Sequence, residues 1–261
     1  MCPMTIDLAR AVALDIHPLG PTIGAEISDI DILFATNAQV AAIRTALTEH
    51  KVLVLRNQNL EDDQHLHFAL RLGDGEPGEV DVLDSDDRLP VHGWRSDESF
   101  LVTPPAASIV RPVILPGLGG DTSWADGEAA YESLSDADRR LADGLIAVHD
   151  DGADRGPTRH PVVRVHPESG RRSLFVNPVY TSHIEGVSDD ESRALLEVFY
   201  AHLTRPEHIV RHRWRLGDVV LWDARSTLRY VNRDYVGRRR MHCVNLCGEV
   251  PAGVRGGRRE S

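Results

Sequence analysis

The chain has 261 residues, with 29 Lys and Arg against 40 Asp and Glu, which gives a formal net charge of −11 at pH 7. This acidic balance argues against nucleic acid or an anionic membrane surface as a partner, because both are bound through Lys and Arg. No run approaches the ~18 apolar residues that span a bilayer, and the opening segment lacks the order of a signal peptide. A cytoplasmic protein is therefore expected.

Local patterns in the first half of the chain predict a strand, a helix, a buried strand and a second helix. Alternating apolar residues indicate the first strand, and apolar residues at helical spacing indicate the helix that follows it. Asn37 is a suitable cap for that helix, which we expect to continue through His50. The second helix is expected to end at a glycine. The four elements are predicted at 16–23, 37–50, 51–56 and 62–72.

Strands are predicted to dominate the second half. Ser188 and Glu191 form a capping box before an apolar stripe, so a helix is expected over 188–203. The acidic, glycine-bearing stretches 73–87 and 150–156 are predicted to be surface loops. Further strands are expected at 107–114, 162–166, 173–177, 219–222 and 242–246. This pattern favours a closed or two-sheet β core decorated by helices, in a single domain that comprises residues 1–261.

Five segments, taken in order, resemble the taurine dioxygenase (TauD/TfdA) family of iron(II)- and 2-oxoglutarate-dependent oxygenases. The segments are 18–27 (PLGPTIGAEI), 51–58 (KVLVLRNQ), 119–122 (GGDT), 222–227 (WDARST) and 239–242 (RRMH). The ordered set extends over nearly the whole chain and is more specific than any single segment. The resemblance implies a mainly β fold with flanking helices, a cupin-like double-stranded β-helix or jelly roll, whose open end holds the site.

In this family a His-x-Asp pair and a distant His hold iron, which leaves three coordination positions open. The resemblance places Arg95 and Asp97 at the first pair and Arg229 at the distant histidine. A guanidinium has only N–H donors and stays protonated, so neither arginine can be a ligand. No metal and no cofactor are therefore expected at the usual iron position. Asp97 is expected to bridge the two guanidiniums.

The resemblance also implies a place for 2-oxoglutarate. Thr122 and Arg239 match the family residues that hold its distal carboxylate, whereas Cys243 replaces a second family arginine, so a taurine-like sulfonate is not expected. Arg95, Arg229 and Arg239 together predict a pocket for a small dianion, because guanidinium forks fit carboxylate and phosphate. The expected ligand is 2-oxoglutarate, a similar dicarboxylate or a substrate that carries a carboxylate.

Further site residues follow from the register of the matched segments. His92, Phe100 and Tyr230 are predicted to line the substrate pocket, although Tyr230 could equally pack beneath the sheet. Proton transfer without a metal needs a titratable side chain near the ligand. The sequence does not single one out among the nearest candidates, which are His92, Asp97, Glu98, Tyr230 and His242.

Three functions stay open at this point. The leading hypothesis is a metal-independent, non-oxidative enzyme of a specialised pathway, such as a lyase, isomerase or cyclase. In it Arg95, Asp97 and Arg229 are the catalytic residues, and the arginines stabilise negative charge as an oxyanion hole does. The second is a catalytically inert binding or scaffolding protein with a decayed site. The third is an iron(II)- and 2-oxoglutarate-dependent oxygenase with relocated ligands, for which His92 and His242 are candidates. A homo-oligomer is expected from the resemblance alone.

Overall fold

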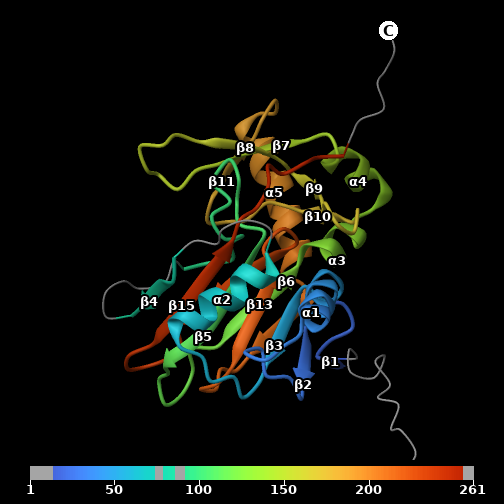
Figure 1. Ribbon diagram of the computed structural model, residues 1–261. Coiled ribbons are helices and arrows are strands. Elements are labelled where there is room, and N and C mark those ends of the chain that lie inside the picture. The colour runs from blue at the N-terminus through green and yellow to red at the C-terminus, as the bar shows by residue number, and fades with distance from the viewer. Residues whose placement is uncertain (1–13, 74–78, 86–91, 255–261) are drawn as a thin grey trace, which may run out of the picture.

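The computed structural model describes residues 14–73, 79–85 and 92–254. Among these residues the largest sheet has seven strands, in the order β1-β2-β3-β13-β5-β15-β4 (Figure 1). The strand bounds are β1 Asp15–Pro18, β2 Ala25–Ser28, β3 Val52–Leu55, β4 Asp81–Asp84, β5 Ala107–Ile114, β13 Val219–Asp223 and β15 Arg240–Leu246.

Three smaller sheets are described, in the orders β12-β6-β14, β11-β7-β8 and β10-β9. Their strands are β6 Thr122–Asp126, β7 Ile146–His149, β8 Thr158–Pro161, β9 Val163–Val165, β10 Arg172–Leu174, β11 Thr181–Ile184, β12 Ile209–His212 and β14 Thr227–Val231. The helices are α1 Asn37–His50, α2 Asp62–Leu72, α3 Gly127–Glu132, α4 Asp136–Ala142, α5 Asp189–Leu203 and the short 3-10 helix Pro206–His208.

The central strands of the large sheet are buried on both faces. On one face Leu53 and Leu221 join a core with residues of α1 and α2. On the other face Val54 and Val220 join a core with residues of β6 and β12. Because side chains of a strand alternate between faces, the apolar runs of β3 and β13 suit such a middle layer.

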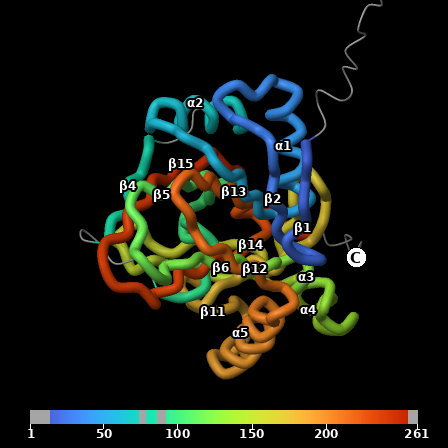
Figure 2. The backbone as a smooth tube through the Cα atoms, turned by 90° about the horizontal axis from the view of Figure 1, so that it is seen from below, coloured from blue at the N-terminus to red at the C-terminus, as the bar shows by residue number. Residues whose placement is uncertain are grey.

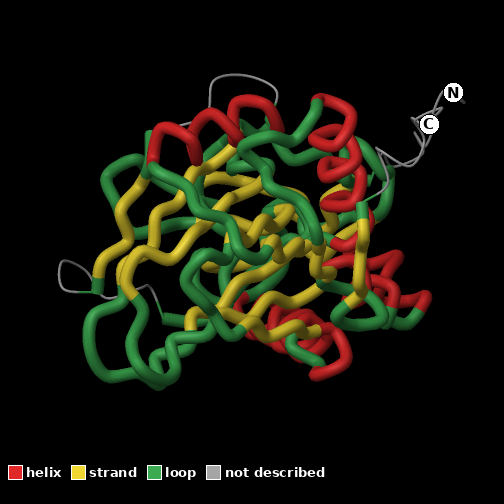
Figure 3. The backbone as a smooth tube through the Cα atoms, turned by 60° about the horizontal axis from the view of Figure 1, so that its bottom comes forward, coloured by secondary structure: helices red, strands yellow, loops and turns green. Residues whose placement is uncertain are grey.

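The layers follow one another in Figure 2: α1 and α2, then the large sheet, then the β12-β6-β14 sheet, then α5. Trp124 of β6 and Trp222 of β13 meet between the two sheets, with ring centroids 5.4 Å apart. Strands lie at the centre and helices at the periphery (Figure 3). The predicted fold class, a mainly β jelly roll with flanking helices, is confirmed. Among the described residues, no helix combines the length and apolarity needed to cross a membrane.

Several predicted elements are present with the expected bounds or close to them. The helix at 62–72 and the strand at 107–114 match α2 and β5. The Ser188 capping box is present, with the hydroxyl of Ser188 accepting from the backbone N–H of Glu191. These elements carry their signals within a few neighbouring residues, which is why the sequence was enough to place them.

Two predictions at the start of the chain were wrong. Of the strand expected at 16–23, only the first part is a strand, β1, which ends at Pro18. The chain then turns toward the antiparallel β2, and in this turn the N–H of Leu19 donates to the carbonyl of Gly24. Helix α1 has Thr36 as its N-cap, not Asn37, because Thr36 and Gln39 form a capping box.

The acidic stretch 73–87 was predicted to be a surface loop, yet it contains β4. This strand pairs with β15, and Asp84 at its end is buried. The carboxylate of Asp84 accepts from Arg238 and Arg240 at 2.6 Å. Composition alone does not show this strand, because its pairing partner lies far away in the sequence.

Candidate active site

Arg95 and Arg229 lie side by side as an antiparallel backbone bridge. The N–H of Arg95 donates to the carbonyl of Arg229 at 3.0 Å, and the N–H of Arg229 donates back at 2.7 Å. Arg229 belongs to β14, which pairs with β6 in the second sheet. The sheet therefore fixes where the segment that carries Asp97 meets β14.

The carboxylate of Asp97 joins this pair of arginines. It accepts from Arg229 at both oxygens, with Nη2 2.6 Å from Oδ1 and Nε 3.1 Å from Oδ2. The indole Nε1 of Trp222 donates to Oδ2 at 2.9 Å, and Nε of Arg95 lies 3.8 Å from Oδ1. The structure thus shows the charged bridge that the sequence predicted, with the closer contact to Arg229.

Burial and charge act in opposite directions on these groups. Burial raises the pKa of Asp97, but the charge and hydrogen bonds of Arg229 outweigh it and hold this pKa below its usual value. Burial and the neighbouring Arg229 lower the pKa of Arg95 to about 10. All three side chains consequently stay charged at neutral pH.

A cavity of about 400 Å³ opens on this cluster. Arg95, Asp97 and Arg229 line it together with Arg239. Further lining side chains include Glu98, Phe100, Tyr180, Tyr235 and Cys243. Of the residues predicted to line the substrate pocket, Phe100 is one of these lining side chains.

His92 and Tyr230 lie elsewhere than expected. Neither lines the described cavity, and their rings pack against each other with centroids 5.6 Å apart. Arg229 and Val231 face the cavity from β14, and Tyr230 between them points to the opposite side of the strand. The alternation of side chains along the strand explains this placement.

The five candidates for proton transfer do not all lie at the cavity. His242 lies on the face of β15 opposite Cys243, where its ring nitrogen is 2.6 Å from Asp62 of α2. Glu98 lines the cavity directly after Asp97, with a left-handed backbone φ of 49°. Burial, followed by repulsion from Asp97, raises the pKa of Glu98. Of the five candidates, Asp97 and Glu98 thus line the described cavity.

Arg239 forms a second cationic group of the cavity. Its Nε donates to the carbonyl of Gly120 at 3.1 Å, and its Nη2 lies 3.4 Å from Oγ1 of Thr122. The same hydroxyl accepts from Nε1 of Trp214 at 2.9 Å. Thr122 is not among the lining residues, so it holds the guanidinium of Arg239 by its hydrogen bond with Nη2 without lining the cavity itself. Burial lowers the pKa of Arg239 to about 10, which leaves it charged.

Two tyrosines of the cavity were not found from the sequence. Tyr180 precedes β11 and meets Phe100 edge-on, with ring centroids 4.9 Å apart. Tyr235 lies between β14 and β15, one residue after Asp234, whose carboxylate accepts from the N–H of Gly120 at 3.0 Å. Neither belongs to the matched segments, and a single tyrosine in a connecting segment has no periodic signal that could have indicated it.

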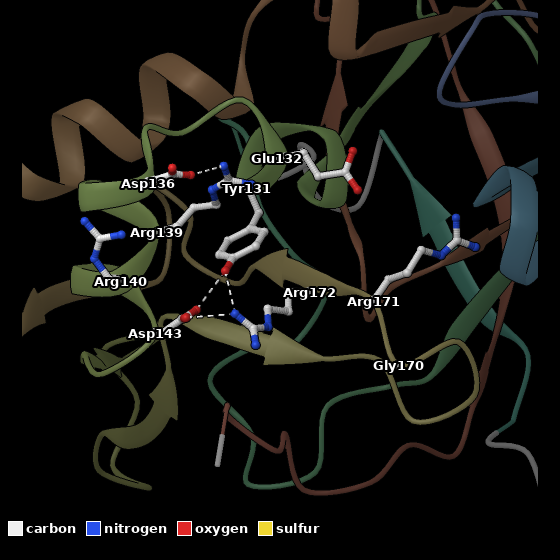
Figure 4. A pocket seen from close by; sticks show the side chains of 9 residues that line it. All are labelled: Tyr131, Glu132, Asp136, Arg139, Arg140, Asp143, Gly170, Arg171 and Arg172. Atoms are coloured by element: carbon white, nitrogen blue, oxygen red, sulfur yellow. Dashed lines mark hydrogen bonds and ion pairs between the residues drawn. The ribbon is translucent and has the colours of Figure 1, made fainter. Parts of the chain in front are cut away.

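A larger hollow of about 500 Å³ lies between α3, α4 and β10 (Figure 4). Two of its arginines pair with neighbouring carboxylates. Arg172 contacts Asp143 at 2.9 Å, and Arg139 contacts Asp136 at 2.5 Å. Tyr131 adds a hydrogen bond to Asp143 (Figure 4). Because these two guanidiniums already have carboxylate partners, the hollow is a weaker candidate for binding an anion than the cavity at Arg95 and Arg239.

Comparison with known proteins agrees with the fold. Residues 15–245 match the family described as "Taurine catabolism dioxygenase TauD, TfdA family". The chain belongs to the TauD/TfdA family.

Relatives within the TauD/TfdA family match over most of their length. The chain is 38% identical to the alpha-ketoglutarate-dependent sulfate ester dioxygenase of Pseudomonas putida, over 95% of this chain and 94% of that protein. It is 33% identical to the alpha-ketoglutarate-dependent 2,4-dichlorophenoxyacetate dioxygenase of Cupriavidus pinatubonensis, over 86% of this chain and 94% of that protein.

Solved structures of the family are also similar. A taurine dioxygenase from Burkholderia xenovorans gives a TM-score of 0.86 at 37% identity, with 94% of each chain covered. The structure of AAD-2 in complex with Mn(II) and N-oxalylglycine gives a TM-score of 0.84 at 28% identity, with 92% of this chain and 99% of that chain covered. These relatives contradict the expectation that no cofactor is used, because two are named as alpha-ketoglutarate-dependent and AAD-2 was solved with a metal ion.

The two cofactors of the family fit the residues of this chain unequally. Carboxylates fit the cavity, because Arg95, Arg229 and Arg239 present N–H donors to it. Iron(II) needs lone pairs, which Asp97 offers and the guanidiniums do not. Within the described ranges, no group of three or more His, Cys, Asp and Glu side chains is placed to hold a metal ion. The residues present therefore do not fit the iron site that the family implies.

Proposed function

We propose that this TauD/TfdA-family protein binds 2-oxoglutarate, or a dicarboxylate of similar size, and acts on a small substrate that carries a carboxylate. The observation that carries the proposal is that Arg95, Arg229 and Arg239 line one cavity of about 400 Å³. The names of the relatives support the choice of 2-oxoglutarate among dicarboxylates.

The charge of Arg239 supports a ligand with a carboxylate. Asp97 contacts both Arg95 and Arg229, so three charged side chains gather at one end of the cavity. Arg239 is buried, with 5% of its surface exposed. It forms no ion pair with a carboxylate of the described residues. A buried cation without a counter-charge is costly, and a bound carboxylate would supply that counter-charge.

The geometry supports one orientation of the ligand. Arg239 would hold the distal carboxylate, as the resemblance implies, and Arg95 and Arg229 would face the 2-oxoacid end. Nε and Nη2 of Arg229 are engaged by Asp97, which fixes the plane of the guanidinium. Fixed N–H donors in a site shielded from water favour negative charge that develops on a carbonyl oxygen. For the reaction we therefore favour non-oxidative chemistry, such as that of a lyase, isomerase or cyclase.

Isothermal titration calorimetry with 2-oxoglutarate and succinate tests the binding. Arg239→Gln is expected to lower the affinity for 2-oxoglutarate at least tenfold, because a charge-assisted hydrogen bond to a carboxylate contributes about 1.5–3 kcal/mol. Arg193→Gln removes an exposed guanidinium of α5 and is the matched control. If the wild type binds neither acid, the proposal fails.

The names of the relatives favour a second function, 2-oxoglutarate-dependent oxygenation. Succinate formed from 2-oxoglutarate by protein reconstituted with iron(II), together with the metal content of that protein, tests it. Succinate formation in proportion to protein would establish oxygenation and refute the non-oxidative reaction. Binding without turnover of any carboxylate substrate would instead indicate a binding protein.

A further inference from the structure

Tyr235 places a buried hydroxyl in the cavity beside Arg239. The tyrosine lines the cavity, and its Oη is shielded from solvent. Among the described residues, this oxygen has no hydrogen-bond partner. Buried tyrosine hydroxyls usually find a partner, because a buried hydroxyl without one has lost its hydrogen bonds to water and gained none in return. The unsatisfied hydroxyl therefore points to a group that is absent from the protein itself.

The backbone around Gly120 allows the tyrosine and the arginine to converge. Gly120 has φ of 74°, and a Cβ there would lie 3.3 Å from Cδ1 of Tyr235 and 3.2 Å from Cδ of Arg239. The N–H of Gly120 donates to the carboxylate of Asp234, the residue before Tyr235, at 3.0 Å. The glycine thus gives the two side chains room, and its hydrogen bond fixes the segment that carries the tyrosine.

The chemistry of this pair suits a carboxylate. Two N–H groups of Arg239 are directed to Gly120 and Thr122, and its guanidinium also faces the cavity. A carboxylate has two oxygens with about four lone-pair sites, so it can accept from a guanidinium and a phenol together. An apolar ligand end would leave the Tyr235 hydroxyl without a partner.

We infer that the Tyr235 hydroxyl donates a hydrogen bond to the ligand carboxylate that Arg239 binds, and that it makes the cavity selective for dicarboxylates over monocarboxylates. The inference rests on the proposed function and adds a residue to it.

Calorimetry on Tyr235→Phe with three acids tests the inference. 2-Oxoglutarate and glutarate both have the distal carboxylate, whereas 2-oxobutyrate is a 2-oxoacid without it. Tyr235→Phe is expected to lower the affinity for 2-oxoglutarate and for glutarate about tenfold. The affinity for 2-oxobutyrate should change less than about twofold. Tyr230→Phe is the matched control, because Tyr230 packs against His92 and Trp94 outside the cavity lining.

The stability of the ligand-free protein gives an independent readout. Removing a buried hydroxyl that lacks a partner should leave the midpoint of urea unfolding unchanged or raise it. A lowered midpoint would show that the hydroxyl has a partner in the protein and would overturn the inference. An equal loss of affinity for all three acids in Tyr235→Phe, or no loss for any of them, would also overturn the inference. In either case, binding of 2-oxoglutarate by the wild type would show that the proposed function still holds. A wild type that binds none of the acids would refute both.

Discussion

The guanidinium of Arg229 and the carboxylate of Asp97 form a two-point ion pair, with Nη2 2.6 Å from Oδ1 and Nε 3.1 Å from Oδ2. The guanidinium also lies over the ring of Trp222, with its central carbon 5.2 Å from the ring centroid. Arg95 approaches the same carboxylate from the adjoining segment at 3.8 Å. Asp97 thus contacts two cations, and all three side chains line the cavity.

The stability of the fold should depend on this carboxylate. Asp97→Asn is expected to lower the free energy of unfolding by about 3–5 kcal/mol, because it removes the carboxylate that pairs with the buried guanidinium of Arg229. Urea unfolding at neutral pH measures the change. Asp190→Asn is the control, since Asp190 pairs with Arg193 on the exposed surface of α5 and should change stability by less than about 1 kcal/mol. Equal losses in the two variants would contradict the prediction.

His65 of α2 should make stability depend on pH. Burial, followed by the charge of Arg111, lowers the pKa of His65 to about 4. As the pH falls below about 6.5, the unfolded chain binds a proton at this residue while the folded protein does not. The contribution of His65 to stability is therefore complete above this pH and is lost between about 6.5 and 4, at up to about 1.4 kcal/mol per pH unit.

His65→Leu is expected to remove that part of the pH dependence. Urea unfolding at several pH values within the window measures the slope of stability against pH. His67→Leu, at an exposed position of the same helix, is the matched control and should retain the wild-type slope. A slope that is unchanged in His65→Leu would show that other groups account for the acid sensitivity.

Gly120 should matter for ligand binding beyond its effect on stability. Gly120→Ala puts a Cβ within 3.3 Å of Pro116, Tyr235 and Arg239, whereas Gly186→Ala, at a similar φ of 77°, meets no atom within 4 Å. Both variants should lose about 1–2 kcal/mol of stability from the left-handed backbone. Only Gly120→Ala should lower the affinity for 2-oxoglutarate, by about tenfold as measured by calorimetry. Equal affinities for 2-oxoglutarate in the two variants would mean that the added Cβ does not disturb the binding position of Arg239.

The scaffold should accept a metal when imidazoles replace the two guanidiniums. Arg95→His with Arg229→His would offer two nitrogen donors beside Asp97, and the backbone bridge between the two positions already holds them together. The double variant is expected to bind Mn(II) more tightly than the wild type, measured by titration against a competing chelator. Each single variant should gain little, since one cation would remain next to the ion. Equal Mn(II) affinity in wild type and double variant would contradict the prediction.

The sequence by itself determined the local elements and the chemistry of the charged residues. Helix α5 could be placed from Ser188 and Glu191 because a capping box is complete within four residues. Arg95 and Arg229 could be judged unsuitable as metal ligands because the donors of a guanidinium do not depend on the fold. The order of the matched segments was enough to indicate the family.

Only the tertiary structure decided which side chains face the cavity. It brought in Tyr180 and Tyr235, placed His92 and Tyr230 outside the lining, and set Thr122 behind Arg239. The direction of a side chain depends on which strand its own strand pairs with and in what register, and one residue of shift reverses the face. That register is set by contacts between segments far apart in the chain, and no local pattern in the sequence contains it.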